Sequence, residues 1–132
     1  MTTWMLVEDD PDLYDMLHDM IEIIGHQVLG FTSGEAAAAW VQSVNEPEAS
    51  DDLPELALID VRLPGKVHGP ELSAQLRQHP VLSSMAIVLM TAYRLSVQQE
   101  SELIARAEPD MMLYKPLPPL PEFRRKLEDL LM

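Results

Sequence analysis

Three carboxylates stand side by side near the N-terminus, directly after an apolar run. Residues 4–7 are Trp-Met-Leu-Val, and Glu8, Asp9 and Asp10 follow them. Like charges this close repel one another, and partial burial strengthens the repulsion. A divalent cation would relieve it, and carboxylate oxygens are hard ligands that suit Mg²⁺. The stretch therefore raises the hypothesis of a metal site.

The three acids have different local explanations. Asp10 precedes Pro11, and this pair is typical of a helix N-cap followed by the first helical position. We interpret Asp10 as a cap rather than as a ligand. Glu8 and Asp9 have no comparable capping role, and we interpret them as half of a metal-binding cradle.

Polar residues also follow three other apolar runs. Asp60, Thr91 and Lys115 each come directly after such a run. An aspartate beside a divalent cation can act as the nucleophile towards a phosphoryl group. A lysine and a hydroxyl can then hydrogen-bond the transferred oxygens. These residues form a candidate phosphoryl-transfer site if the fold brings the runs together.

Short apolar runs alternate with helical patterns along the whole chain. The runs predict strands at residues 4–7, 27–31, 56–59, 86–90 and 111–114, each followed by a helix. Several runs are continuously apolar, as in a parallel sheet covered by helices on both faces. We predict an α/β fold with a five-stranded parallel, doubly wound sheet in one domain, residues 1–132. Ligands of such folds lie beyond the carboxyl ends of the strands, where the polar residues stand.

The helix patterns carry their own start signals. Thr32 and Glu35 are three residues apart, which predicts a capping box at the second helix. Residues 45–54 read as a polar loop, residues 95–107 as the fourth helix, and the last helix begins near Pro119.

Composition and charge exclude several classes of function. The chain has 132 residues, 47% of them hydrophobic, and no cysteine, which argues against disorder, disulfides and thiolate metal sites. Nine basic and 22 acidic residues give a net charge of −13, so we expect no direct nucleic-acid binding. No run reaches the length of a membrane span and no signal peptide is visible. We expect a cytoplasmic protein without membrane contact.

Four motifs in register resemble one known family, the receiver domain of two-component response regulators. They are "LVEDDPDL", "LALIDVRLPG", "IVLMTAY" and "LYKPL", each at the end of a predicted strand. The resemblance covers essentially the whole chain and implies a flavodoxin-like (βα)5 three-layer sandwich of the CheY-like superfamily. No output domain is expected within these 132 residues.

The resemblance implies a role for each site residue. Asp60 corresponds to the phosphoacceptor. Glu8 and Asp9 correspond to the acidic pair that binds Mg²⁺, or Mn²⁺, with Asp9 as the direct ligand. The backbone carbonyl of Arg62 corresponds to a further metal ligand beside Asp60.

Two more positions match the family's motif. Thr91 corresponds to the hydroxyl that turns inward to the phosphoryl group. Lys115 corresponds to the active-site lysine, in a Lys–Pro bond that family members usually hold in cis.

Two departures from the family pattern stand out. Met112 occupies the position where the family usually has an aromatic switch residue, three before the lysine, although a flexible methionine is able to fill that space. The loop after the phosphoacceptor, "LPGKVHGPEL", is one residue longer than the common form.

The expected function is a phosphorylation switch rather than an enzyme acting on a separate substrate. The resemblance implies a histidine kinase or a histidine phosphotransfer protein as phosphodonor. It also implies a downstream protein bound by the face of the fourth helix, fifth strand and fifth helix, where Leu95, Met111, Phe123 and Leu127 lie. Assembly as a homodimer stays open.

Three alternatives stay open beside that function. One is a receiver-like interaction module that does not switch. A Mg²⁺-dependent hydrolase with an aspartyl nucleophile is less favoured, because the acids after the first strand are contiguous and the chain has no length for a cap domain. A phosphohistidine role for His18 is also weaker; the four histidines show no metal-binding spacing.

Overall fold

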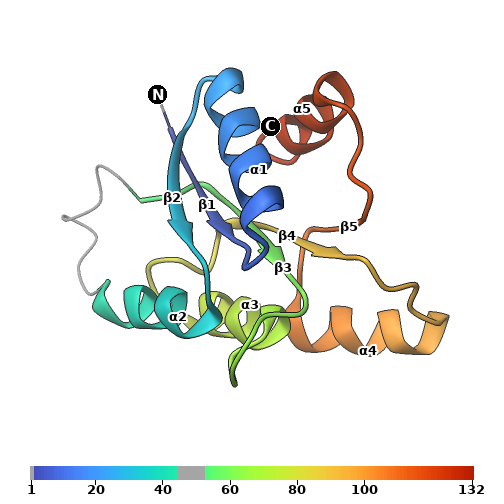
Figure 1. Cartoon of the computed structure of the whole chain (residues 1–132). Coiled ribbons are helices and arrows are strands. Elements are labelled where there is room, and N and C mark those ends of the chain that lie inside the picture. The colour runs from blue at the N-terminus through green and yellow to red at the C-terminus, as the bar shows by residue number, and fades with distance from the viewer. Residues whose placement is uncertain (1, 45–52) are drawn as a thin grey trace.

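The computed structural model describes residues 2–44 and 53–132, and a five-stranded parallel sheet lies at its centre (Figure 1). The strand order is β2-β1-β3-β4-β5, so the chain is wound in both directions from β1, as predicted. The strands are β1 (Thr3–Val7), β2 (Gln27–Phe31), β3 (Leu56–Asp60), β4 (Ala86–Thr91) and β5 (Met111–Tyr114).

Five helices cover the two faces of the sheet. Helices α1 and α5 lie on one side and α2, α3 and α4 on the other (Figure 1). This is the predicted three-layer α/β sandwich. The helices are α1 (Pro11–Ile24), α2 (Gly34–Ser43), α3 (Gly69–Gln78), α4 (Val97–Ala107) and α5 (Leu120–Asp129).

The central strands are buried on both faces, which explains their continuous apolar sequence. Along β1, Trp4 and Leu6 pack with α1 and α5, whereas Met5 and Val7 pack with α2 to α4. All four side chains are fully buried. Because neighbouring side chains on a strand point to opposite faces, each layer needs its own apolar set.

The cap predicted for α1 is confirmed, and the cap predicted for α2 is wrong. The Asp10 carboxylate accepts hydrogen bonds from the backbone N–H groups of Asp12 and Leu13. In α2, Ser33 rather than Thr32 is the N-cap. Two hydroxyl residues adjoin there, and the path of the chain from β2 decides which one faces the helix end.

The polar ends of the strands are part of the sheet. Asp60 is the last residue of β3 and Thr91 the last of β4, one position beyond the predicted strands, so backbone pairing fixes both.

Helix α4 begins at Val97, two residues later than predicted, because Ser96 caps it. The loop predicted at 45–54 lies outside the described residues except for its last two. Across 2–44 and 53–132, no helix is long and apolar enough to cross a membrane.

Candidate functional site

A lysine lies between two buried carboxylates at the carboxyl edge of the sheet. The Lys115 ammonium donates to Glu8 Oε1 at 3.1 Å and to Asp60 Oδ2 at 3.1 Å. The Glu8 side chain is 1% exposed and that of Asp60 10%. The three residues come from the ends of β1, β3 and β5, and parallel winding brings them to one edge. The structure thus brings together residues that the sequence places up to 107 positions apart.

The third carboxylate of the cluster is Asp9. Oxygens of Glu8, Asp9 and Asp60 lie within 4.8 Å of one another, and only Asp9 is exposed to solvent. Three hard oxygen donors with one open side fit Mg²⁺, which prefers a few carboxylates and keeps several waters. Even with Lys115 present, carboxylates outnumber ammonium groups three to one. The donor set therefore fits a divalent cation.

Burial and repulsion shift the proton affinities of the buried groups. Burial, together with contact with Asp60, raises the pKa of Glu8 to about 7, although the Asp10 N–H and Lys115 act in the opposite direction. Burial by itself would lower the pKa of Lys115, but its hydrogen bonds and attraction to Asp60 and Glu8 raise it. Lys115 is therefore a firmly charged ammonium, and Glu8 holds a proton more readily than an ordinary carboxyl group.

Backbone groups fix the orientation of the two buried acids. The Asp10 N–H donates to Glu8 Oε2 at 3.2 Å, and the Arg62 N–H donates to Asp60 Oδ1 at 3.3 Å. Gly69 packs so closely that an added Cβ would lie 2.3 Å from the Asp60 carbonyl oxygen. The ligand role of the Arg62 carbonyl stays a prediction.

Thr91 lies on the strand next to Asp60. It is 1% exposed, and it directly follows Met90, the register partner of Asp60. Its hydroxyl accepts a hydrogen bond from the Tyr93 N–H at 3.1 Å. A hydroxyl that accepts one bond keeps its own proton free to donate, so Thr91 is able to bond a group that enters the site.

The mouth of the site contains a contact that sequence reasoning missed. The Arg62 guanidinium lies 3.9 Å from the centre of the Tyr93 ring. This cation–π pair joins the loop after β3 to the loop after β4. Both residues are two positions beyond a strand-end site residue, but spacing alone does not show that two exposed side chains meet.

Met112 occupies the position where the family usually has an aromatic residue. Met112 is half-buried against the α2–α4 layer and lines a pocket of about 270 Å³ with Glu100, Ile104 and Tyr114. The Tyr114 hydroxyl donates to Glu100, which ties β5 to α4. The bond between Lys115 and Pro116 is cis.

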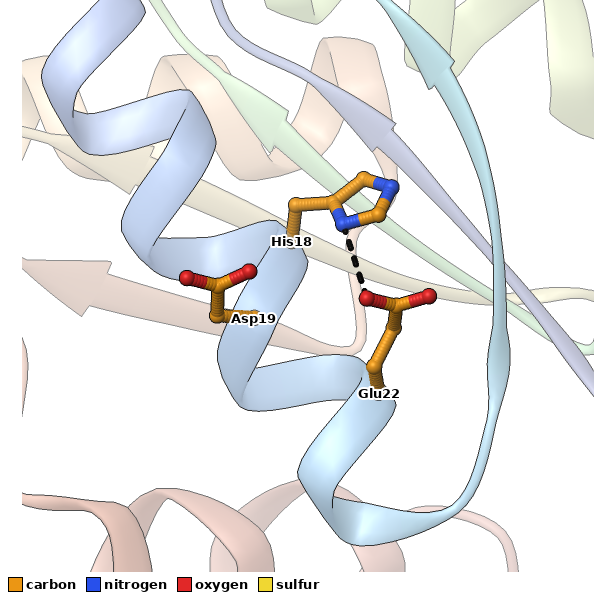
Figure 2. A group of neighbouring side chains, drawn as sticks. All are labelled: His18, Asp19 and Glu22. Carbon is orange, nitrogen blue, oxygen red and sulfur yellow. Dashed lines mark ion pairs between the residues drawn. The ribbon is translucent and has the colours of Figure 1, made fainter.

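A second group of potential metal ligands lies on α1, away from the sheet edge (Figure 2). Ligand atoms of His18, Asp19 and Glu22 lie within 4.8 Å of one another. The His18 Nδ1 is already paired with Glu22 Oε1 at 3.3 Å, four residues along the helix. Such an i,i+4 pair is an ordinary solvated helix contact.

The α4–β5–α5 region mixes accessible and inaccessible side chains. Phe123 and Leu127 are fully buried against β1, β3 and β4, and so belong to the core rather than to a contact face. Leu95 and Met111 are half-buried. On α4, Val97 is 86% exposed and Ile104 is 42% exposed.

Comparison with known proteins gives one consistent family. The family model described as response regulator receiver domain matches residues 5–123. Response regulator Rcp1 of Synechocystis sp. is 31% identical over 106 residues, which cover 79% of this chain and 68% of that protein.

Solved structures with the same fold include receiver domains from distant organisms. One is the signal receiver domain of a modulated diguanylate cyclase from Desulfovibrio desulfuricans G20, with 27% identity, a TM-score of 0.76 and coverage of 98% of this chain and 93% of that one. Another is a CheY-like response regulator receiver domain protein from Methanospirillum hungatei JF-1, with 22% identity, a TM-score of 0.77 and coverage of 98% and 94%. The second likeness supports the fold alone.

Proposed function

The chain belongs to the response regulator receiver domain family, and we propose that it is a switch that accepts a phosphoryl group on Asp60. The observation that carries the proposal is the contact between Asp60, buried at the end of β3, and the Lys115 ammonium, 3.1 Å away, within a cluster of three carboxylates. This arrangement supplies a nucleophile and a countercharge for an incoming phosphoryl group.

Asp60 is the best nucleophile of the three acids. Glu8 has a pKa raised to about 7 and the Asp9 carboxylate is exposed, whereas Asp60 lies between Lys115 and the Arg62 N–H. In the transfer, an Asp60 carboxylate oxygen forms a bond to phosphorus. The bond from phosphorus to the donor's imidazole nitrogen breaks and its electron pair stays on that nitrogen, so a donor ring that is protonated on its other nitrogen leaves as neutral imidazole. The product is an acyl phosphate and a free histidine.

Lys115 and Thr91 bind the transferred group. The Lys115 ammonium already contacts Asp60 and need only turn to reach a phosphoryl oxygen. Thr91 is free to donate its hydroxyl proton to another oxygen. If Thr91 turns, the hydrogen bond from the Tyr93 N–H weakens, and Tyr93 lies in the loop that leads to α4. Phosphorylation of Asp60 would thereby change the conformation of the loop at the start of α4.

Glu8, Asp9 and Asp60, with the Arg62 carbonyl, would hold Mg²⁺. When bound, the cation neutralises charge on the phosphoryl oxygens and lowers the repulsion between an anionic nucleophile and an anionic donor. The chain's own residues orient the acceptor, as the backbone bonds to Glu8 and Asp60 already do.

The partners follow from the switch. We propose a histidine kinase or histidine phosphotransfer protein as phosphodonor, a downstream protein at the α4–β5–α5 face, and the cytoplasm as the place of action. We propose no turnover of a separate substrate; sustained release of phosphate from added phosphate esters would contradict that part.

Phosphorylation by a small donor tests the proposal. We expect the intact protein, incubated with Mg²⁺ and acetyl phosphate, to gain the mass of one phosphoryl group, and Asp60→Asn to gain none. Chelation of Mg²⁺ should also abolish the gain in the wild type. Equal gain in Asp60→Asn, or no gain in the wild type, would overturn the assignment. Amide NMR spectra before and after phosphorylation separate a switch, whose α4 and β5 resonances shift, from a module that does not respond.

A further inference from the structure

A carboxylate on α2 holds the loop that follows the proposed phosphoacceptor. Glu35 Oε2 accepts hydrogen bonds from the backbone N–H groups of Lys66 at 2.6 Å and Val67 at 3.2 Å. These bonds keep the pKa of Glu35 below its usual range, so its carboxylate is charged. Glu35 therefore does not form the predicted capping box with Thr32; it contacts residues 31 and 32 positions further along the chain.

Two glycines allow this close approach. A Cβ on Gly34 would lie 1.9 Å from the Val67 carbonyl oxygen, and a Cβ on Gly65 would lie 2.5 Å from Glu35 Oε2. Gly65 also has a φ of +82°, a conformation that other residues rarely adopt. The start of α2 and the loop thus fit together through backbone and a single carboxylate.

Hydrogen bonds within the loop connect Lys66 and Val67, the residues that Glu35 holds, to the site around Asp60. Next to Val67, the His68 ring nitrogen Nδ1 accepts from the Leu63 N–H at 3.3 Å, and the Gly69 N–H donates to the Val61 carbonyl at 3.0 Å. The Arg62 N–H, between Val61 and Leu63, donates to Asp60. Lys66 and Val67 are therefore linked to Asp60 and to the Arg62 carbonyl through a short series of hydrogen bonds and adjacent residues.

The geometry points to Glu35 as a positioning residue for the metal site: it holds the loop of residues 61–68 so that Asp60 and the Arg62 carbonyl keep their metal-binding arrangement. This inference rests on the proposed function, because it assumes that the site binds Mg²⁺. It gives a physical reason for the position of this loop, whose tip residues are exposed, beside the site. Through Glu35, α2 would also help to position the residues that carry out the phosphorylation chemistry.

Two substitutions at Glu35 separate positioning from charge. Glu35→Ala removes the acceptor of both bonds. Glu35→Gln removes the charge but keeps one carbonyl oxygen, and Glu35 uses a single oxygen for both bonds. Partners that orient metal ligands typically cost about 10–100-fold in metal affinity when removed. For this more distant residue we expect the Mg²⁺ dissociation constant, measured by calorimetric titration, to rise about 3–10-fold in Glu35→Ala and to stay within about twofold of wild type in Glu35→Gln.

Glu102→Ala is the matched control, because Glu102 is an exposed glutamate on α4 whose one side-chain hydrogen bond within residues 2–44 and 53–132 is to Gln98 of the same helix. It should leave the dissociation constant unchanged. The rate of phosphorylation by acetyl phosphate should fall in Glu35→Ala at low Mg²⁺ and recover at saturating Mg²⁺. Because Mg²⁺ binding also stabilises the fold, the assay is run at a temperature at which circular dichroism shows Glu35→Ala to be fully folded without Mg²⁺. Hydrogen exchange at the Lys66 and Val67 amides should accelerate in Glu35→Ala alone.

The outcomes are distinguishable. If wild type and Glu35→Ala bind Mg²⁺ equally well, or if Glu102→Ala weakens binding as much, the role of Glu35 is overturned while the proposed function stands. If the wild type binds no Mg²⁺ at all, the proposed metal site itself fails, and the inference with it.

Discussion

The two edges of the sheet surround their carboxylates with different partners. At the amino edge, one carboxylate is surrounded by donors: Glu55 Oε1 accepts from the Trp4 indole N–H at 3.1 Å and from the Thr2 hydroxyl at 2.7 Å. The His26 ring stacks on Trp4 at 4.2 Å. Among the described residues, His26 Nε2 is the only buried side-chain polar atom without a partner.

The carboxyl edge reverses that balance. There, Glu8 and Asp60 share the ammonium of Lys115, and an oxygen of Asp9 lies within 4.8 Å of oxygens of both acids as a third carboxylate. Burial, and after it contact with Asp60, raises the pKa of Glu8, and the opposing effects of the Asp10 N–H and Lys115 do not cancel that rise. The difference teaches that one sheet can match a carboxylate with donors at one edge and hold an excess of carboxylates at the other; under the proposed function, a cation and a phosphoryl group would meet that excess. Four changes test this contrast, from the largest expected effect to the smallest.

Removing the ammonium should have the largest effect. Lys115→Met leaves Glu8 and Asp60 buried without a counter-ion, and breaking a buried ion pair on one side costs about 3 kcal/mol or more. We expect that loss in the free energy of unfolding, measured by urea denaturation in a Mg²⁺-free buffer at pH 8. A loss below about 1 kcal/mol would mean that the carboxylate repulsion is already relieved in another way.

Adding Mg²⁺ should stabilise the carboxyl edge by binding linkage. At about 100 times the dissociation constant, a ligand that binds only the folded state stabilises it by about 2.7 kcal/mol. We expect thermal melting to move upward accordingly in the wild type. The gain should largely vanish in Asp9→Asn. Melting that is insensitive to Mg²⁺ would remove the main support for the cradle of Glu8 and Asp9.

Raising the pH should destabilise the metal-free protein through Glu8. Its folded-state pKa of about 7 lies above the ordinary value of 4.5, so its stabilising contribution is complete below pH 4.5 and is lost as the pH rises through 7. From pH 5 to pH 8, wild-type stability should fall relative to Glu8→Gln by on the order of 2 kcal/mol. A parallel pH dependence of the two proteins, by urea denaturation with a chelator, would refute the shift.

The smallest effect is expected at the amino edge. Glu55→Gln keeps an acceptor for Trp4 and Thr2 but makes both hydrogen bonds neutral, which should cost about 0.5–1 kcal/mol. The loss should be the same with and without Mg²⁺, because the two edges are separate. If Mg²⁺ changed it, the edges would be coupled and the contrast between them would not hold.

Much of this molecule is predictable from its sequence, because the signals are local and periodic. Apolar runs with helical patterns between them gave the order of the elements and the layers, since burial on both faces demands continuous apolar strands. Placing Glu8, Asp9, Asp60, Thr91 and Lys115 at one edge follows from the geometry of any parallel sheet. Asp10 as the cap of α1 follows from its neighbour Pro11.

Tertiary structure alone decided the contacts between side chains far apart in the chain. Glu35 had a good local partner in Thr32, yet it binds the backbone of Lys66 and Val67, because α2 packs beside the loop after β3. The meeting of Arg62 with Tyr93 and the burial of Phe123 depend in the same way on the distances and angles between packed elements. Local pattern determines which elements form and which ends carry charge; only packing in three dimensions selects among the partners that each side chain could reach.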